Sequence, residues 1–276
     1  MTKNTAMAPI NEHHFEFGKN WQRFLTQFDE ERVDQAKSSL LEMLEVKDLS
    51  DLSFLDVGCG SGLFSLAAMR LGAKKVKSFD YDPQSVACAN ELKRRFFPLE
   101  NKWVIEQGDI LEKNYLSSLG QWDLVYSWGV LHHTGSMWKA LENVASLVKP
   151  SGKLFIAIYN DQGTASKIWL WIKKMYNDLP GGLRFLVLIP TFIRLWFPTM
   201  VLDLLQLKPF PHWKNYNSMR GMSPWTDVVD WVGGYPFEVA KPELILEYFK
   251  KREFVLEKIK TVGSSHGNNE FIFKKL

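Results

Sequence analysis

Cysteine is scarce in this chain, which has only Cys59 and Cys88 among its 276 residues. The two are not spaced as a disulfide framework, so a cystine-stabilised secreted domain is excluded and a reducing, cytoplasmic setting is favoured. No cluster of histidine, cysteine and carboxylate residues has metal-ligand spacing, and we therefore expect no metal. The N-terminal residues contain no apolar segment of the signal-peptide type.

Net charge is also small, at +3, so the composition neither requires nor excludes a nucleic-acid partner. Six basic residues cluster near one expected helix, at Lys74, Lys75, Lys77, Lys93, Arg94 and Arg95. A solvated helix face explains this cluster most simply, because nucleic-acid binding would need a continuous basic face at the ligand-binding edge. The sequence thus disfavours nucleic acid as the partner.

What the chain does contain is a strand-to-helix turn rich in glycine. An apolar run at 54–57 includes Asp56, and Gly58, Gly60 and Gly62 follow it at alternate positions. The next segment, 63–71, has the periodicity of a helix. Because glycine has no Cβ, such a turn lets the backbone come close to a bound cofactor. The pattern predicts a nucleotide-like ligand at this turn.

The same alternation of apolar runs and helical periods continues to residue 159. We expect strands at 53–57, 75–80, 102–107, 123–127 and 153–159, with helices near 63–71, 83–97, 111–118 and 137–148. After residue 241 a helix precedes two further strands, at 253–261 and 269–274. This is typical of an α/β fold with a doubly wound, seven-stranded, mostly parallel sheet and a C-terminal antiparallel hairpin. Ligands of such sheets bind where the carboxyl ends of the strands meet.

Outside this core the chain divides into two further parts. Residues 1–50 are expected to form an N-terminal helical cap of two amphipathic segments, the second a helix at 34–44. Residues 51–159 and 241–276 make up the core. Residues 160–240 form an aromatic helical insertion between the fifth and sixth strands, where we expect a substrate lid.

Three acids stand where strands should end: Asp56, Asp80 and Asp109. Asp80 follows the glycine turn by about 20 residues, which is the usual place for a carboxylate that accepts both ribose hydroxyls. The glycine spacing is one residue tighter than the dinucleotide fingerprint, and Asp56 before the turn suits a cationic ligand better than a pyrophosphate. S-adenosylmethionine fits these features because it carries an ammonium, a sulfonium, a ribose and an adenine but no phosphate.

With these motifs in this order, the chain resembles the class I S-adenosylmethionine-dependent methyltransferases, of the small-molecule type that acts in quinone and natural-product biosynthesis. Residues 122–133, WDLVYSWGVLHH, are similar to the fourth-strand motif of that family, and 149–154, KPSGKL, to its turn into the fifth strand. The resemblance implies binding of S-adenosyl-L-methionine, with S-adenosyl-L-homocysteine as product. The cofactor contacts that it implies are Asp56, Gly58, Cys59, Gly60, Gly62, Asp80, Tyr81, Asp109, Ile110, Ser127 and Trp21.

Each of these residues also has a plain structural explanation. The glycines could serve only a tight turn, and Asp80 or Asp109 could cap the helix that follows. Trp21 could belong to a helix packed outside the sheet. Taken together these explanations do not account for the order of the motifs, and we therefore prefer the cofactor interpretation.

Methyl transfer from a sulfonium needs alignment and removal of a proton rather than a protein nucleophile. His132 and His133 follow the fourth strand and are candidate general bases, since the pKa of histidine lies near neutrality. His133 is preferred because it is further from the strand, although either residue could instead cap a helix or shape the cofactor floor. Tyr159 and Asn160, at the end of the fifth strand, are candidates to orient a substrate or simply to form hydrogen bonds there.

The insertion offers the best clue to the substrate because it is strongly aromatic and apolar. Between 183 and 197 its polar residues are Arg184, Thr191 and Arg194. Pro190 and Pro198 should break the apolar run. Four interpretations stay open for 183–205, namely burial within the insertion, a wall of an apolar substrate pocket, contact with a membrane surface and a dimer interface. The prolines and Asp203 argue against a membrane-spanning helix.

We therefore expect a methyltransferase that uses S-adenosylmethionine to methylate an oxygen or nitrogen of a small molecule with an apolar or aromatic part. A tRNA or other RNA methyltransferase is the alternative, because some of those enzymes carry a similar His-His pair after the fourth strand. A non-catalytic cofactor-binding protein is a further alternative. We expect a cytoplasmic protein, with peripheral membrane contact left open and the oligomeric state undecided.

Overall fold

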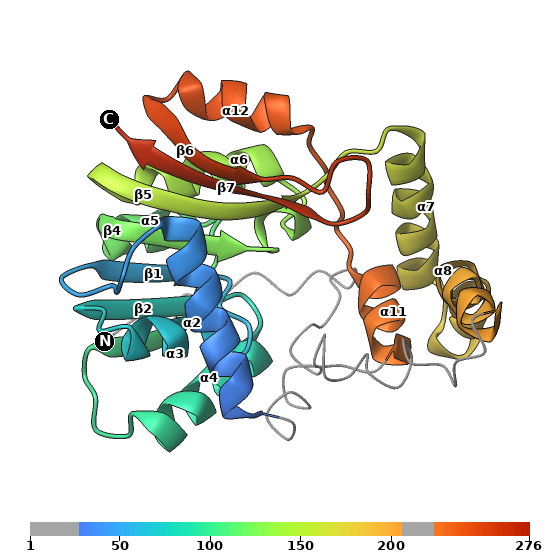
Figure 1. Ribbon diagram of the computed structural model, residues 1–276, viewed down its shortest axis with the longest axis horizontal. Coiled ribbons are helices and arrows are strands. Elements are labelled where there is room, and N and C mark those ends of the chain that lie inside the picture. Colours follow the sequence, from blue (N-terminus) through green and yellow to red (C-terminus); the bar gives the residue numbers. More distant parts are fainter. Residues whose placement is uncertain (1–27, 206–223) are drawn as a thin grey trace, which may run out of the picture.

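The computed structural model describes residues 28–205 and 224–276, and across them seven strands form one sheet (Figure 1). The strand order is β3-β2-β1-β4-β5-β7-β6, with β1 to β5 parallel and β7 antiparallel to both of its neighbours. The predicted sheet with its C-terminal antiparallel hairpin is therefore confirmed. Its strands are β1 (Ser53–Val57), β2 (Lys75–Asp80), β3 (Trp103–Gln107), β4 (Trp122–Trp128), β5 (Val148–Tyr159), β6 (Phe254–Lys260) and β7 (Asn268–Lys275).

Helices cover both faces of this sheet. One face carries α2 (Glu30–Leu44), α3 (Leu63–Arg70) and α4 (Pro83–Phe96), and the other α5 (Lys113–Leu119), α6 (Met137–Ser146) and α12 (Pro242–Lys250). Parallel strands covered on both sides are near-continuous apolar runs, and β1 is buried at every position. A short 3₁₀ turn, η1 (Leu131–His133), follows β4 at the carboxyl edge.

Several predicted boundaries differ by one or two residues, and the starts of one helix and one strand differ by more. α2 begins at Glu30 rather than at residue 34, because the side chain of Asp29 caps it by accepting the N–H of Arg32. β5 begins at Val148 rather than at residue 153, since Val148 already pairs with Trp122 before a shift in register. Trp21, which was expected to contact the cofactor, lies outside the described residues.

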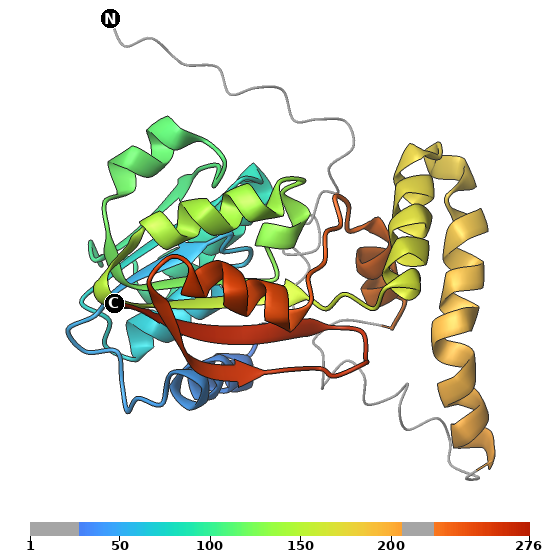
Figure 2. The same ribbon diagram turned by 90° about the horizontal axis from the view of Figure 1, so that it is seen from above.

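The insertion leaves the core and rejoins it at a single point. Asn160 and Ala240 form a parallel bridge, and the N–H of Ala240 donates to the carbonyl of Tyr159. The described helices between them are α7 (Thr164–Asp178), the short turn η2 (Gly181–Leu183), α8 (Phe185–Leu205) and α11 (Pro224–Gly233). Figures 1 and 2 show these helices beyond the carboxyl end of β4, with α8 outermost.

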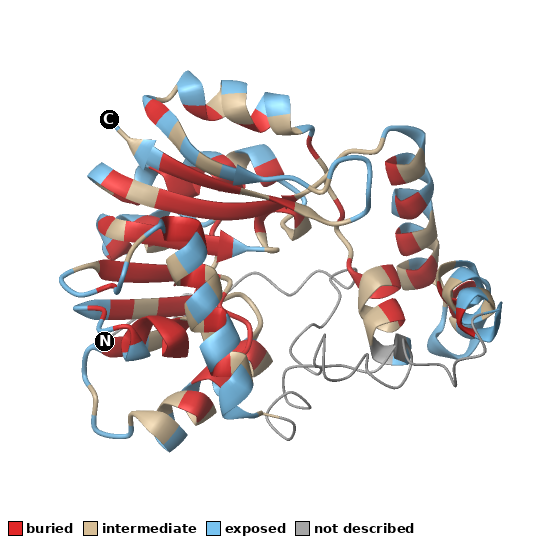
Figure 3. Ribbon diagram, viewed as in Figure 1, coloured by how far each residue is buried: buried red, intermediate tan, exposed pale blue. Residues whose placement is uncertain are grey.

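α8 differs from its prediction. The helix continues through Pro190 and Pro198, so the expected breaks are wrong. Each proline removes one backbone hydrogen bond, and the remaining bonds of the helix are enough to keep it continuous. One side of α8 packs through Val187 and Leu188 against α7 and α11, and much of the remainder is exposed (Figure 3). Together with η2 it is, in the described part of the chain, the one helix long and apolar enough to cross a membrane by length and composition.

Candidate functional site

The glycine turn joins β1 to α3 at the carboxyl edge of the sheet. Gly58, Gly60 and Gly62 have positive φ angles of 74°, 52° and 82°, a region that favours glycine. A Cβ on Gly58 would lie 2.4 Å from the side chain of Val130, and one on Gly62 would lie 2.8 Å from the Cβ of Ala89. Conformation and packing therefore both require glycine at positions 58 and 62, and conformation favours it at position 60, so the turn presents backbone rather than side chains.

Asp80 ends β2 directly beside this turn. Its two carboxylate oxygens accept the N–H of Gly60 and the N–H of Asp82, each at 2.9 Å. Each oxygen keeps a further lone pair, which matches the two hydroxyl groups of a ribose. Burial raises the pKa of Asp80 to about 6, although the N–H groups oppose that shift.

Asp56 is 2% exposed and is held by a chain of hydrogen bonds. The indole N–H of Trp103 donates to the hydroxyl of Ser78, and the hydroxyl of Ser65, 2.6 Å from that of Ser78, donates to Asp56 at 2.5 Å. Burial raises the pKa of Asp56 to about 7, with the charge of Asp80 adding to the shift. The chain ties the acid to β2, β3 and α3, so its orientation is fixed before any ligand binds.

Two other predicted cofactor contacts are engaged in the fold itself. The hydroxyl of Ser127 is fully buried and donates to the carbonyl of Val57 within the sheet. The backbone N–H of Cys59 donates to the carbonyl of Phe79, and burial holds the pKa of its thiol well above the usual value. Cys59 is thus a neutral thiol, and both residues fix the turn relative to its neighbouring strands.

Asp109 and Ile110 follow β3 on the next part of the edge. Asp109 accepts the N–H of Leu111, and the side-chain amide of Asn143 donates to the carbonyl of the buried Ile110. Tyr81 is close by, since the charge of Asp109 adds to burial in raising the pKa of its hydroxyl. The structure therefore brings the acids of three adjacent strands to one edge.

This donor set fits the expected cofactor. Carboxyl groups at the ends of β1, β2 and β3 match an ammonium, a sulfonium, ribose hydroxyls and an adenine amino group. A pyrophosphate would instead face three acids, which disfavours a dinucleotide. The glycine turn supplies a surface that a single added Cβ at position 58 or 62 would disrupt.

The two histidines after β4 have different surroundings. His132 is fully buried, and its Nδ1 accepts the backbone N–H of Tyr159 at 3.3 Å. Its Nε2 has no hydrogen-bond partner in the described part of the chain. Burial lowers the pKa of His132 well below 6.5, with His133 and Lys173 adding to the shift, so the ring is neutral.

His133 is partly buried and is oriented by the end of the insertion. Its Nδ1 lies 2.7 Å from the carbonyl oxygen of Pro236. Because a carbonyl only accepts, Nδ1 carries the proton and a neutral ring keeps a lone pair on Nε2. The backbone N–H of Glu238 donates to the carbonyl of His132, so the same segment holds both histidines.

Tyr159 and Asn160 diverge at the end of β5. The ring of Tyr159 lies 3.8 Å from that of His132 and 5.3 Å from that of His133, centroid to centroid. The amide of Asn160 instead donates to the carbonyl of Gly263 and accepts from Asn269, and so ties β5 to the β6–β7 hairpin. Of the two residues, only Tyr159 joins the histidine cluster.

Sequence reasoning missed the contribution of the insertion to this edge. The rings of Trp231 and Phe237 lie 5.5 and 5.3 Å from that of Tyr159. Lys173 is fully buried beneath them: its ammonium donates to the carbonyl of Trp231 and lies 4.3 Å from that indole ring. Burial lowers the pKa of Lys173 to about 7. The available signal was its spacing from Trp169 and Tyr176, which share its buried helix face.

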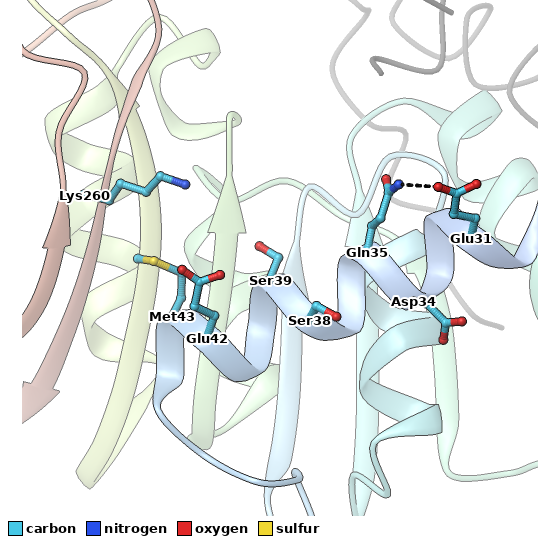
Figure 4. A pocket seen from close by; sticks show the side chains of 8 residues that line it. All are labelled: Glu31, Asp34, Gln35, Ser38, Ser39, Glu42, Met43 and Lys260. Carbon is cyan, nitrogen blue, oxygen red and sulfur yellow. Dashed lines mark hydrogen bonds between the residues drawn. The ribbon is translucent and has the colours of Figure 1, made fainter. Parts of the chain in front are cut away.

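Two hollows occur in the described part of the chain. A small space of about 10 Å³, room for about one water molecule, lies between β5, the insertion and the hairpin, lined by Tyr159, Asn160, Gln162, Ser166, Trp169, Trp231, Phe237, His266 and Gly267. A larger groove of about 410 Å³ runs along α2 (Figure 4), lined by Glu31, Asp34, Gln35, Ser38, Ser39, Glu42, Met43 and Lys260. None of the groove's residues belongs to the glycine turn or the histidine cluster, so its size does not locate the site.

Comparisons with known proteins agree with this geometry. A family model described as a methyltransferase domain matches residues 27–197. Ribosomal protein L11 methyltransferase of Photobacterium profundum is 31% identical over 129 residues, which are 44% of this chain and 38% of that protein. The corresponding protein of Vibrio campbellii is 46% identical over 115 residues, 41% of this chain and 36% of that protein. The chain thus spans less than two fifths of these curated relatives.

Solved structures share the fold at low sequence identity. Magnesium protoporphyrin IX methyltransferase from Synechocystis PCC 6803 with bound SAH has a TM-score of 0.52 at 16% identity, covering 98% of this chain and 90% of that chain. An S-adenosylmethionine dependent methyltransferase from Mesorhizobium loti has a TM-score of 0.51 at 14% identity, covering 87% of this chain and 98% of that chain. The predicted class I fold is thereby confirmed.

Proposed function

We propose that this chain, which belongs to the family of methyltransferase domains, transfers a methyl group from S-adenosylmethionine to an oxygen or nitrogen of a small molecule with an apolar or aromatic part. The observation that carries the choice of acceptor is the ring cluster at the carboxyl edge. Tyr159 packs on both histidines, the rings of Trp231 and Phe237 pack on Tyr159, and Lys173 is buried rather than presented to a ligand.

Different residues of the chain would bind different parts of the cofactor. Asp80 would accept the ribose hydroxyls, Asp109 the adenine amino group, and Asp56 with the glycine turn would hold the methionine part. When bound, S-adenosylmethionine supplies a methyl group on a good leaving group, so the protein need only align the acceptor and exclude water. The buried orientation of Asp56 and the fixed turn serve that alignment.

His133 is the residue we assign to proton removal. Its Nδ1–H donates to Pro236, and in the neutral ring the lone pair of Nε2 is the group that can take up the proton of an acceptor hydroxyl or amine. His132 is too deeply buried to exchange a proton with a substrate, and its role is to position the Tyr159 backbone. Tyr159 forms part of the acceptor wall.

The surface argues against nucleic acid as acceptor. Several members of the basic cluster already have partners: Lys77 pairs with Glu106, and Arg94 and Arg95 both pair with Glu91. A phosphate backbone would have to break these pairs. The names of the curated relatives favour a second candidate, a ribosomal protein acceptor, although the matched part covers less than half of those proteins.

The cysteines bear on the cellular location of the protein. Cys59 and Cys88 are both buried free thiols, which suits a reducing compartment, and we propose the cytoplasm.

The test uses cofactor with a labelled methyl group and three acceptor pools: a metabolite extract, total RNA and ribosomal protein L11. We expect label in small molecules of the extract. Label in RNA or in L11 alone would overturn the proposed acceptor while retaining the methyltransferase activity. No label in any pool, with binding intact, would favour a non-catalytic cofactor-binding protein.

Binding is tested separately by calorimetry with S-adenosylhomocysteine. Asp80→Asn should weaken binding roughly 100-fold, because hydrogen bonds to a charged group are worth about 1.5–3 kcal/mol each. The matched control is Asp34→Asn, on the exposed side of α2, where the carboxylate pairs with Lys37. Equal binding by both variants would remove Asp80 from the site.

A further inference from the structure

One side of α8 presents a continuous apolar stripe to the outside. Leu186, Ile189, Ile193, Phe197, Met200 and Leu204 follow one another at steps of three and four residues, and their exposed fractions lie between 38% and 63%. At 1.5 Å per residue the stripe is about 27 Å long. Figure 2 shows α8 as the outermost helix, with α7 between it and the sheet. An apolar patch of this extent marks an interaction surface.

α8 differs from an ordinary surface helix because it is apolar around most of its circumference. Its buried residues are Val187, Leu188, Thr191, Trp196 and Asp203, and the large aliphatic and aromatic side chains of the stripe face outward. Normally the apolar side of such a helix packs on the core and the polar side meets water. α8 is therefore built to meet an apolar environment on its outer side.

The charges of α8 indicate which environment this is. Asp203 is its one carboxylate and is 1% exposed, so α8 presents no negative charge outward. Arg194, near the middle of the helix, is exposed. An apolar stripe flanked by a long cationic side chain matches the boundary between acyl chains and anionic headgroups, where arginine can reach the phosphates.

We propose that α8 lies flat on an anionic lipid membrane, with the stripe among the acyl chains and Arg194 at the headgroups. The helix lies on the surface rather than across it because its other side, through Val187 and Leu188, packs on α7 and α11. The insertion that contains those helices joins the edge that carries the histidines through the Asn160–Ala240 bridge and the bond from the N–H of Glu238 to the carbonyl of His132. The inference rests on α8 alone and does not depend on the proposed acceptor.

A second copy of the chain fits this surface less well. In an antiparallel two-fold pair of α8 helices the stripes would meet about their midpoint, close to residue 195. The two Arg194 side chains would then lie on the same flank of the contact, with no exposed carboxylate of α8 to offset them. Like charges placed together across an interface oppose association.

The test is flotation of the full-length protein with vesicles of phosphatidylcholine containing phosphatidylglycerol, compared with pure phosphatidylcholine. We expect wild type to float with the anionic vesicles and at least fivefold less with the neutral ones. Ile193→Glu and Phe197→Glu should each abolish flotation, since a carboxylate cannot enter the acyl layer without a large penalty. Arg194→Gln should remove the preference for anionic lipid.

The matched control is Leu244→Glu, which places the same charge at an exposed apolar residue of α12 in the core, 49% exposed. It should float like wild type. Calorimetry with S-adenosylhomocysteine and thermal melting establish that each variant is folded. Absence of wild-type flotation, equal flotation of Ile193→Glu and wild type, or a dimer in sedimentation that Ile193→Glu dissolves would each overturn the proposal.

Discussion

The sheet core and the insertion both contain apolar segments, but the core buries its strand β1 completely, whereas the insertion leaves one side of α8 exposed. In β1 every residue is buried, including Phe54 and Leu55. In α8 the buried set includes Thr191 and Asp203, while Ile193 and Phe197 face outward. Apolar sequence therefore indicates burial only where the chain itself supplies the cover. In the core the cover is helices of the same chain, and for the outer side of α8 the proposed cover is a membrane surface.

Buried polar groups show a second difference between the two regions. The core buries Asp56 at the end of a hydrogen-bonded chain that runs through Ser65 and Ser78. The insertion buries Lys173 against one backbone carbonyl and two rings. The core thus holds its charged group by directed hydrogen bonds, and the insertion holds its own mainly by aromatic contact.

The strongest test of this comparison replaces one glycine in each region. Gly58→Ala combines a left-handed backbone with a Cβ 2.4 Å from Val130. We expect a loss of about 2–5 kcal/mol in the free energy of unfolding, from strain of about 1–2 kcal/mol and overpacking of about 1–3 kcal/mol. Binding of S-adenosylhomocysteine should be lost as well. Denaturant unfolding and calorimetry measure the two effects.

Gly163→Ala is the matched variant, since Gly163 at the start of the insertion has a similar φ of 62° but open space around its Cβ position. Its ψ of −114° lies outside the left-handed helical region, so a Cβ is strained there as well. The variant should lose only this backbone contribution, about 1–3 kcal/mol, and keep cofactor binding. If both variants behave alike, close packing is not what requires glycine at position 58.

This contrast explains how much the sequence could predict. β1 matches its expected limits because burial on both faces imposes an apolar run that a turn residue ends on either side. β2 also matches its expected limits, although it is only partly buried and contains Lys75 and Lys77. The acids Asp80 and Asp109 lie at strand ends, where topology brings them together whatever the side chains around them. Local pattern and tertiary position agree in this part of the chain.

The contacts between the insertion and the edge were not predictable in the same way. The hydrogen bond between His133 and Pro236 joins residues 103 apart in sequence, and no periodicity reports on it. Pro190 and Pro198 suggested breaks, but a helix packed along one side keeps its path through both. Pattern alone could not distinguish a buried apolar helix from an exposed one, because that depends on what covers it.

The next test asks whether His133, which the insertion orients through Pro236, acts as the general base. His133→Ala should lower kcat roughly 100-fold, the usual contribution of a general base, while affinity for S-adenosylhomocysteine stays within about twofold of wild type. His133→Gln separates two roles, because its amide can still donate to Pro236 but cannot take up a proton. Steady-state turnover across pH decides between them. If the glutamine variant recovers wild-type turnover, His133 positions the edge and is not the base.

The smallest expected effect concerns the buried charge of the insertion. The pKa of Lys173 is lowered by burial to about 7 in the folded protein, from 10.5 when the chain is unfolded. Between these values the unfolded chain holds more protons, so the stability of wild type should rise with pH relative to Lys173→Met. The slope cannot exceed about 1.4 kcal/mol per pH unit, and it should vanish below about pH 6, where Lys173 is protonated in both states.

Urea unfolding of wild type and Lys173→Met between about pH 6 and pH 9 measures this difference. Lys174→Met is the control, since Lys174 is the neighbouring lysine of α7 and is exposed; its difference from wild type should be flat over the same range. A flat difference for Lys173→Met as well would mean that the aromatic rings stabilise the ammonium as fully as water does. The insertion would then hold its buried charge as firmly as the core holds Asp56, and the contrast between the two regions would reduce to the exposed face of α8.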